Sequence, residues 1–354
     1  ADTKVFLSGG RIQGASTDTL PIPQTSWKEI DRVDGNGIRV MDTYTSGGNF
    51  TPPDVMMIIF NKNGTGAGGV LTFNNDSATD TYERNFSYNG GAWASQTGEA
   101  GINWYANSGD GADFSIMHIE NRSGSEKSFV ATQMEAGDSG AGAGTNSVEM
   151  SGKWIGTSQI NRVAIDAGSG NTFPAGTELI VLGYDYDEAD SGTSFWTQIA
   201  STTLTSTPST SGSAASPQIG LSWTGDYKYL WVSGYVYMST DWTTTFDEKN
   251  ASGDYTWDYS TNGANYTNIG SSASHAGFHV TGDAGWTAFQ AVITNMSGKE
   301  KMYWYNGGHI VDNSNSQAPS WRRVFGKGTY GTGQIHSIQF WSGSMTVNAP
   351  STVT

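Results

Sequence analysis

The sequence predicts an all-β protein, with two tandem homologous antiparallel β-sandwiches of jelly-roll type after an extended N-terminal arm. Glycine supplies 47 of 354 residues, aromatic residues 12% and charged residues only 14%. An average soluble domain has about 7% glycine and about 25% charged residues. Turn formers combined with aromatic strand formers favour short strands and tight turns. No segment has an apolar stripe of helical period with capping residues.

An internal repeat predicts the domain organisation. Segments in the first half recur in the same order in the second, at offsets that drift only from about 169 to 175 residues. The matching pairs are Trp27–Ile30 with Trp196–Ile199, Phe73–Gly90 with Phe246–Gly263, and Ile119–Lys127 with Ile293–Lys301. We therefore predict an arm at residues 1–24, copy one at 25–188 and copy two at 189–354. The boundary falls in the acidic stretch Tyr184–Ser194.

Strands follow from local patterns in each copy. The apolar runs Val55–Phe60 and Tyr229–Tyr237 predict buried strands, and alternating residues predict half-exposed ones. Further aligned strands are Phe114–Ile119 with Phe289–Ile293, and Ile160–Ile165 with Ile335–Phe340. Glycine-rich clusters predict loops at Asn61–Gly69 and Ala136–Gly144. The last strand of copy two is expected to be short, and its completion by another subunit is left open.

Charge and composition exclude several functions. The net charge of −15 argues against nucleic acid or an anionic membrane as a partner, because the chain has no excess of cations. No apolar stretch approaches the roughly 20 residues of a membrane span, and the first residues do not resemble a signal peptide. With no cysteine, disulfides and thiolate sites are impossible.

The sequence contains no motif typical of a catalytic or cofactor-binding site. The five histidines are interpreted as strand or turn positions, and no phosphate-binding loop precedes a helix. We expect no catalytic residue and no cofactor. A weak calcium candidate is the acidic group Asp185, Asp187, Glu188 and Asp190, which lacks the spacing of a calcium loop. A glycosidase with paired carboxylates remains open, since acidic residues are plentiful in the loops.

Aromatic residues in polar loops are candidates for glycan binding, because sugar faces stack on rings. The candidates are Trp93, Trp104, Tyr105, Trp242 and Trp304. The favoured interpretation is that most of them fill sandwich cores or subunit contacts.

A resemblance to a known family rests on Gly9–Gly14, on Thr25–Ile30, and on Phe73, Tyr82 and Tyr88–Gly91 in copy one, with copy two more diverged. Over the arm and the two sandwich copies, hence most of its length, the chain resembles a family of virion structural proteins from tailed phages, especially marine ones. It implies a β-rich structural role on the particle and no enzyme activity. It assigns no active-site residue.

The leading hypothesis is therefore a non-enzymatic virion structural protein at the particle exterior, made in the host cytoplasm. It would be a head decoration, capsid fibre or tail-associated protein, and a homo-oligomer, with a trimer favoured. We expect the arm to bind capsid or tail proteins through Val5, Phe6, Leu7 and Ile12. The alternatives are a glycan-binding adhesin for host attachment, a double jelly-roll major capsid protein, and a polysaccharide-degrading sandwich enzyme.

Overall fold

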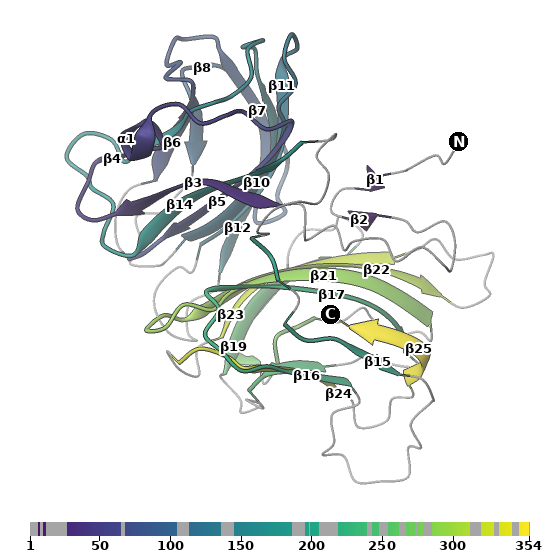
Figure 1. The fold of residues 1–354 in the computed structure, drawn as a ribbon. Coiled ribbons are helices and arrows are strands. Elements are labelled where there is room, and N and C mark those ends of the chain that lie inside the picture. The colour runs from purple at the N-terminus through teal and green to yellow at the C-terminus, as the bar shows by residue number, and fades with distance from the viewer. Residues whose placement is uncertain are drawn as a thin grey trace.

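The computed structural model describes most of the chain after residue 26 (Figure 1). The described residues are 6–7, 10–11, 27–64, 68–104, 113–135, 145–185, 195–197, 199–204, 219–238, 243–247, 254–261, 267–273, 275–278, 285–311, 320–328, 333–341 and 347–353.

The first half consists of two antiparallel sheets. The large sheet has the order β3 (Lys28–Gly35), β14 (Thr177–Tyr184), β5 (Val55–Lys62), β10 (Asp113–Glu120), β11 (Lys127–Glu135), β12 (Asn146–Trp154), β7 (Tyr82–Tyr88) and β8 (Ala94–Glu99). The small sheet has the order β4 (Val40–Asp42), β13 (Val163–Asp166), β6 (Gly69–Phe73) and β9 (Ile102–Trp104). A four-residue helix, α1 (Tyr44–Gly47), follows β4.

The second half repeats this arrangement, with one strand fewer in the described part of its small sheet. Its large sheet has the order β15 (Thr202–Leu204), β25 (Val347–Val353), β17 (Tyr229–Met238), β21 (Gly285–Thr294), β22 (Lys301–Val311), β23 (Ser320–Gly328), β19 (Tyr255–Thr261) and β20 (Thr267–Ala273). Its small sheet has the order β16 (Ile219–Ser222), β24 (Ser337–Trp341) and β18 (Thr243–Phe246). Strand for strand, the large sheets of the two halves have the same order.

The strand order is that of a jelly roll with one sheet extended. When β3, β4, β5, β6, β9, β10, β13 and β14 are counted one to eight along the chain, the sheets read 1-8-3-6 and 2-7-4-5. This is the double Greek key of a jelly roll. The hairpin strands β7 and β8 and the meander strands β11 and β12 widen the large sheet beyond β10. The all-β sandwich fold expected from the sequence is thus confirmed.

Buried contacts recur at aligned positions of the two halves. The Tyr82 hydroxyl accepts a hydrogen bond from the Phe73 backbone N–H at 2.8 Å, and the Tyr255 hydroxyl does the same for Phe246. Both tyrosines are buried, so each hydroxyl satisfies a strand-end N–H that water cannot reach.

A buried asparagine in each half also forms equivalent contacts. The Asn121 side chain bonds the backbone N–H and C=O of Ile160, and Asn295 bonds the N–H and C=O of Ile335. Each asparagine ties the turn after a large-sheet strand to the segment that enters the small sheet. That the two halves have a common origin remains a prediction. A duplication of one ancestral domain would produce equivalent tyrosine and asparagine contacts of this kind.

The large sheets also pack against each other. Each half has its own core between its two sheets, and a third cluster joins the large sheet of the first half to that of the second. Its buried members are Met57, Ile59, Phe114, Ile116, Met134, Ile180, Leu182, Trp196, Tyr229, Val292, Met302 and Phe325. The chain is therefore a stack of four layers, in which the upper and lower halves of Figure 1 meet through their large sheets.

This stacking explains the continuous apolar runs. In β5, Met56, Ile58 and Phe60 face the core of the first half, whereas Met57 and Ile59 face the second half. Successive residues of a strand point to opposite faces, so a strand covered on both sides is apolar throughout. The prediction of a buried strand here is confirmed, and the reason is the contact between the halves.

Two details differ from expectation. The final strand, β25, has seven residues and pairs on both sides within the chain, with β15 and with β17. It is neither notably short nor left for another subunit to complete.

The expected loop at Asn61–Gly69 begins later, because Asn61 and Lys62 continue β5. The expected loop at Ala136–Gly144 lies outside the described residues.

Candidate functional site

A connecting segment, residues 195–197 and 199–200, brings aromatic rings to the junction of the two halves. The Phe195 N–H donates to the Trp27 carbonyl at 2.7 Å, which ties this segment to the start of the first half. Trp196, only 7% exposed, packs edge-on against Trp231 of β17, with ring centroids 5.4 Å apart and planes at 80°. It also packs edge-on against Phe195 at 5.0 Å. The rings therefore form a corner rather than a flat stack.

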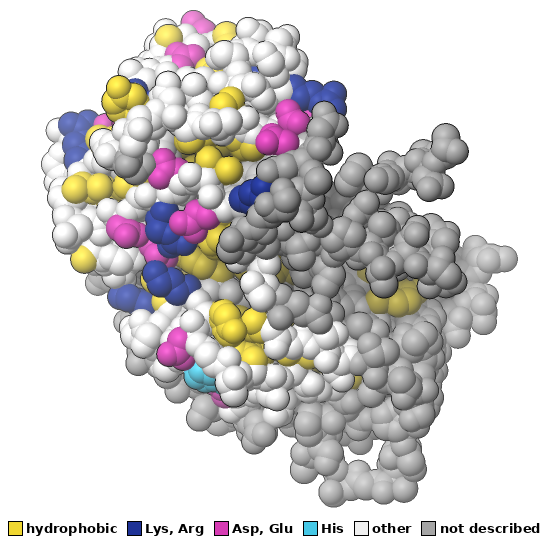
Figure 2. Space-filling model, in the orientation of Figure 1, with side chains coloured by type: hydrophobic (Ala, Val, Ile, Leu, Met, Phe, Trp, Pro, Cys, Tyr) yellow, Lys and Arg dark blue, Asp and Glu magenta, His cyan; other side chains and the backbone are white. Residues whose placement is uncertain are grey.

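This corner is part of a pocket of about 210 Å³. Its lining is Phe195, Trp196, Thr197, Ile199, Ala200, Leu221, Trp223, Tyr227, Tyr229, Leu230, Trp231, Val232 and Ile338. The pocket lies where the connecting segment meets β16, β17 and β24, so both sheets of the second half contribute to it. None of these lining side chains is charged. In Figure 2 an apolar area on the lower half is bordered by polar atoms and by grey ones.

Trp223 is a further lining residue of the pocket. It follows β16, and its backbone N–H donates to the His336 carbonyl at 3.0 Å, which fixes the start of the loop. Its indole Nε1 is buried without a hydrogen-bond partner among the described residues. At the rim, Tyr227 is 37% exposed, and its carbonyl accepts a bond from the Gln334 side chain.

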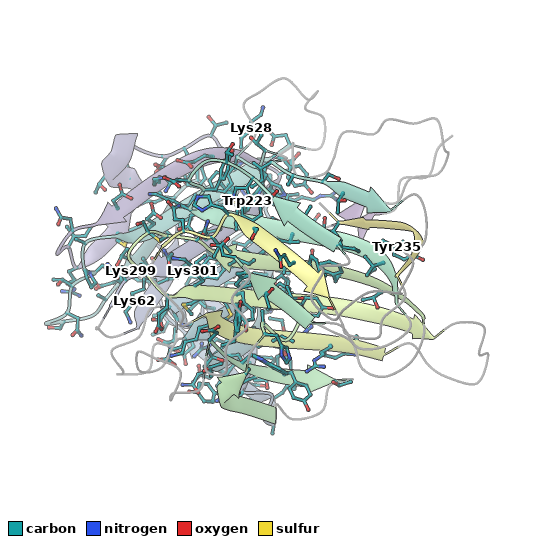
Figure 3. All side chains as sticks on the ribbon, turned by 90° about the horizontal axis from the view of Figure 1, so that it is seen from below. Lys28, Lys62, Trp223, Tyr235, Lys299 and Lys301 are labelled. Carbon is teal, nitrogen blue, oxygen red and sulfur yellow. The ribbon has the colours of Figure 1, made fainter. Side chains whose placement is uncertain are left out.

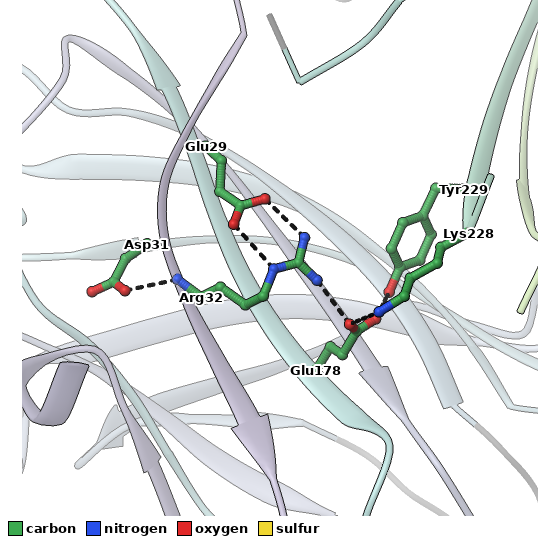
Figure 4. A network of polar contacts seen from close by, with 6 residues as sticks. All are labelled: Glu29, Asp31, Arg32, Glu178, Lys228 and Tyr229. Atoms are coloured by element: carbon green, nitrogen blue, oxygen red, sulfur yellow. Dashed lines mark hydrogen bonds and ion pairs between the residues drawn. The ribbon is translucent and has the colours of Figure 1, made fainter. Parts of the chain in front are cut away.

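A polar network joins the halves close to the pocket (Figure 4). The Glu178 carboxylate, 4% exposed, accepts from Arg32 Nη1, Lys228 Nζ and the Tyr229 hydroxyl, each at 2.7 Å. Burial by itself raises the pKa of Glu178, but the hydrogen bonds from Lys228 and Tyr229 outweigh it and leave the pKa below its ordinary value. Because Tyr229 also lines the pocket, this network positions one of its walls.

The aromatic residues chosen from sequence have different environments. Trp93 is 58% exposed between β7 and β8. Trp104 is 2% exposed and donates its indole N–H to Ser115 at 2.8 Å, so it is a core residue and offers no surface to a sugar. Trp304 is partly buried against the cluster between the large sheets, which also removes it from a binding face. Tyr105 and Trp242 lie outside the described residues.

The remaining candidates fall mostly outside the described part. Phe6 and Leu7 form the short strand β1, which pairs with β2 (Gly10–Arg11), whereas Val5 and Ile12 lie outside.

Of the four acidic calcium candidates, only Asp185 is described, and its carboxylate accepts from the Asp54 backbone N–H at 2.9 Å. Asp187, Glu188 and Asp190 lie outside the described residues. Within the described ranges, no three His, Asp or Glu side chains are grouped to hold a metal ion.

Buried ionisable groups occur elsewhere, with structural partners. Lys62 and Asp113, each 1% exposed, form an ion pair at 2.9 Å. Lys301 donates to the carbonyls of Met296 and Lys299, and burial lowers its pKa to about 8. In the view of Figure 3, Lys62, Lys299 and Lys301 lie near one another, and Trp223 lies apart from them. Burial also lowers the pKa of His118 to about 4. Each of these groups fits a role in folding.

Sequence reasoning missed the pocket. Trp196 was visible only as the repeat partner of Trp27, and Trp223 and Trp231 carried no motif. A usable signal was the density of aromatic residues in Phe195–Trp196 and Trp223–Trp231.

Comparisons with known proteins identify no family. No protein-family model matches the chain, and no curated protein sequence matches it. Among solved structures, human GIVD cytosolic phospholipase A2 aligns at 7% identity and a TM-score of 0.13, over 78% of this chain and 33% of that one. The chain thus spans about a third of that enzyme. A pair of C2 domains from Extended-Synaptotagmin 2 aligns at 7% identity and a TM-score of 0.10, over 81% of this chain and 93% of that one. Such scores carry no argument about function.

Proposed function

We propose that the chain is a non-enzymatic structural protein on the exterior of a virus particle, as a head decoration, capsid fibre or tail-associated protein. The observation that carries the proposal is the jelly-roll strand order of the first half, which the described strands of the second half repeat except for the counterpart of β9, with the large sheets packed face to face. Jelly rolls build many viral capsid and lectin domains. This is an analogy at the level of the fold, and it joins the sequence resemblance described above.

Surface chemistry supports the same role. The net charge of −15 keeps such a protein soluble and repels nucleic acid. Positive and negative side chains are intermixed over the upper half and the junction in Figure 2, with no extended basic patch on the described part of this face. In the described part of the chain, no helix is long and apolar enough to cross a bilayer.

The proposal is tested on purified particles. Quantitative mass spectrometry should detect the chain at a fixed stoichiometry to the main capsid protein. Its absence from particles that carry the gene would refute the proposal.

The arm and the oligomeric state belong to this proposal. Particles assembled with a chain that lacks residues 1–24 should lose the protein, and full occupancy would contradict an attaching role for the arm. Light scattering of the purified chain should give a homo-oligomer, with a trimer favoured, and a monomer at all concentrations would contradict that part.

A second candidate function is glycan binding during host attachment. The aromatic pocket beside the junction favours it, together with the exposed Trp93. A glycan array probed with the full chain tests it, and no binding to any glycan would reject it.

A further inference from the structure

We infer that Lys62 and Asp113 condense with each other to form an amide between their side chains, which cross-links β5 to β10 inside the first half. Glu135 of β11 transfers the protons in this reaction. The reaction takes place once in each chain and turns over no substrate, so it is independent of the proposed role on a particle. The chain contains no cysteine, so a disulfide could not supply such a cross-link.

The backbone register brings the three side chains together. Asp113, the first residue of β10, lies directly opposite Lys62, the last residue of β5, and directly opposite Glu135, the last residue of β11. Side chains directly opposite each other in an antiparallel pair share a face, with Cβ atoms about 4.5–5.5 Å apart. Asp113 therefore lies between an amine and a second carboxylate in one row across the sheet.

The Lys62–Asp113 contact is close to the geometry of the reaction. Lys62 Nζ lies 2.9 Å from Asp113 Oδ2, and this oxygen is bonded to Cγ, the carbon that the amine attacks. Two groups held in contact in this way react as if each were at a very high concentration. Both side chains are only 1% exposed, so bulk water neither separates them nor reaches the amide once it has formed.

The surroundings of the pair favour uncharged side chains. Lys62 continues the face of β5 on which Ile58 and Phe60 pack into the core of the first half. Burial raises the pKa of Asp113, Lys62 opposes this, and the carboxylate of Glu135 adds to it, so that the pKa reaches about 7. A neutral amine and a protonated carboxyl group are the forms that condense, because an ammonium has no free electron pair and a carboxylate resists attack.

The ion pair also leaves one carboxylate oxygen unsatisfied. Asp113 Oδ1 is buried without a hydrogen-bond partner among the described residues. A buried polar atom of this kind is costly, and more so when it belongs to a charged group. Condensation removes one oxygen and both charges, so it relieves this cost.

The reaction balances without another reactant. A proton passes from the Lys62 ammonium to the Asp113 carboxylate, and the Nζ electron pair then attacks Cγ. Glu135 accepts a proton from the attacking nitrogen and gives it to the Asp113 hydroxyl, which leaves as water when the Cγ–O bond breaks. One C–N bond forms, one C–O bond breaks, and Glu135 ends in its initial state.

The second half provides an internal comparison. At the offset of 174 residues that aligns Ile119 with Ile293, Asp113 corresponds to Thr287. Thr287 lies opposite Val236 on one side and His309 on the other. Val236 and Thr287 are buried, so the equivalent positions of β17 and β21 hold an uncharged pair. The fold therefore does not require an ion pair here, and burying two charges has a desolvation cost that an uncharged pair avoids.

Mass spectrometry of the purified, denatured wild-type chain tests the inference, because an ion pair separates on denaturation whereas an amide persists. We expect the chain to be lighter than the mass of its sequence by one water molecule. A trypsin digest should contain residues 40–84, uncut at Lys62, joined through Asp113 to residues 85–122. A wild type at its full sequence mass, or a digest in which these peptides are separate, would overturn the inference.

Variants assign the roles of the residues. Lys62→Arg keeps a positive charge but replaces the amine with a poor nucleophile, so the chain should have its full mass. Glu135→Gln keeps the shape of the side chain and removes the proton acceptor, and it should slow amide formation about a hundredfold or more. Lys153→Arg is the matched control: Lys153 forms an exposed ion pair with Glu126, and this variant should show the same loss of water as the wild type.

The outcomes separate the cross-link from other losses of water. A loss that persists in Lys62→Arg would place the reaction at another residue and refute the Lys62–Asp113 amide. Amide formation at the wild-type rate in Glu135→Gln would refute the role of Glu135 alone. Circular dichroism identifies the folded variants, and if Lys62→Arg does not fold, the joined peptide of the wild type decides the question.

Discussion

Replacing Glu178 with glutamine should destabilise the whole chain, because its carboxylate joins the two halves. Glu178 accepts three hydrogen bonds at 2.7 Å, from Arg32 in its own half and from Lys228 and Tyr229 in the other. Removing one member of a buried charge pair costs about 3–5 kcal/mol. The glutamine variant keeps the shape of the side chain and removes only its charge and one acceptor oxygen.

The partners reduce this cost. Lys228 is 57% exposed and returns to water when the carboxylate is lost. Arg32 retains Glu29, which it contacts at 2.8 Å. The Tyr229 hydroxyl is buried and can still donate to the new amide oxygen. We therefore expect Glu178→Gln to lower the free energy of unfolding by about 2–3 kcal/mol.

Urea unfolding, followed by tryptophan fluorescence and circular dichroism, measures the effect. Glu29→Gln is the matched control: it removes a carboxylate from the same arginine at a 38% exposed position, and should cost less than about 1 kcal/mol. A cycle that adds Tyr229→Phe should give a coupling energy of about 1 kcal/mol or more with Glu178→Gln. A loss below about 0.5 kcal/mol for Glu178→Gln would refute the reasoning.

The same carboxylate predicts a pH dependence. The pKa of Glu178 lies below its ordinary value in the folded chain, so the unfolded chain binds a proton first as the pH falls. Its contribution is therefore complete at neutral pH and is lost as the pH falls through the folded-state pKa. The stability difference between wild type and Glu178→Gln should shrink accordingly in acid.

Three further predictions concern packing and protonation. Burial lowers the pKa of His118 to about 4, against about 6.5 in the unfolded chain. The free energy of unfolding should therefore fall between pH 6.5 and pH 4, by at most about 3 kcal/mol. His118→Gln should flatten that part of the pH profile, and an unchanged profile would contradict the burial of His118. Asn121→Ala should lower the free energy of unfolding, measured by chemical denaturation, by about 3 kcal/mol, because it leaves buried backbone groups of Pro53 and Ile160 unpaired. A loss below about 1 kcal/mol would show that water replaces the amide. Gly326→Ala should lower the melting temperature by several degrees, because a Cβ there would collide with the Tyr303 ring, whereas Gly220→Ala, with open space around it, should not.

The fold was largely predictable from the sequence because strand period and turn residues are local signals. The alternation in Ile335–Phe340 predicts a strand, and β24 (Ser337–Trp341) lies over most of that range, with Ile338 and Phe340 buried and Gln339 between them only half-buried. The contact between the large sheets was not predictable. A continuous run such as Val55–Phe60 shows that both faces of a strand are covered, but not what covers the second face.

The pocket was not predictable for a related reason. Trp104 and Trp93 lie in similar glycine-rich surroundings, yet one is 2% and the other 58% exposed. Which ring turns inward depends on tertiary partners such as Ser115, which accepts from Trp104. The pocket itself joins residues of three strands, the loop between β16 and β17, and a connecting segment, so no contiguous motif describes it.

The face-to-face packing of the large sheets makes the chain equivalent to a dimer with its subunits covalently joined. Equivalent strands, β5 and β17 or β10 and β21, contribute to the same cluster from opposite sides. Two separate subunits would dissociate on dilution, whereas a tether holds them at a high effective concentration. The tether also frees the two faces from being identical, so one cluster combines Met57 and Ile59 from one large sheet with Val292 and Phe325 from the other. A proteolytic cut between residues 185 and 195 would make the stability of the stack depend on protein concentration.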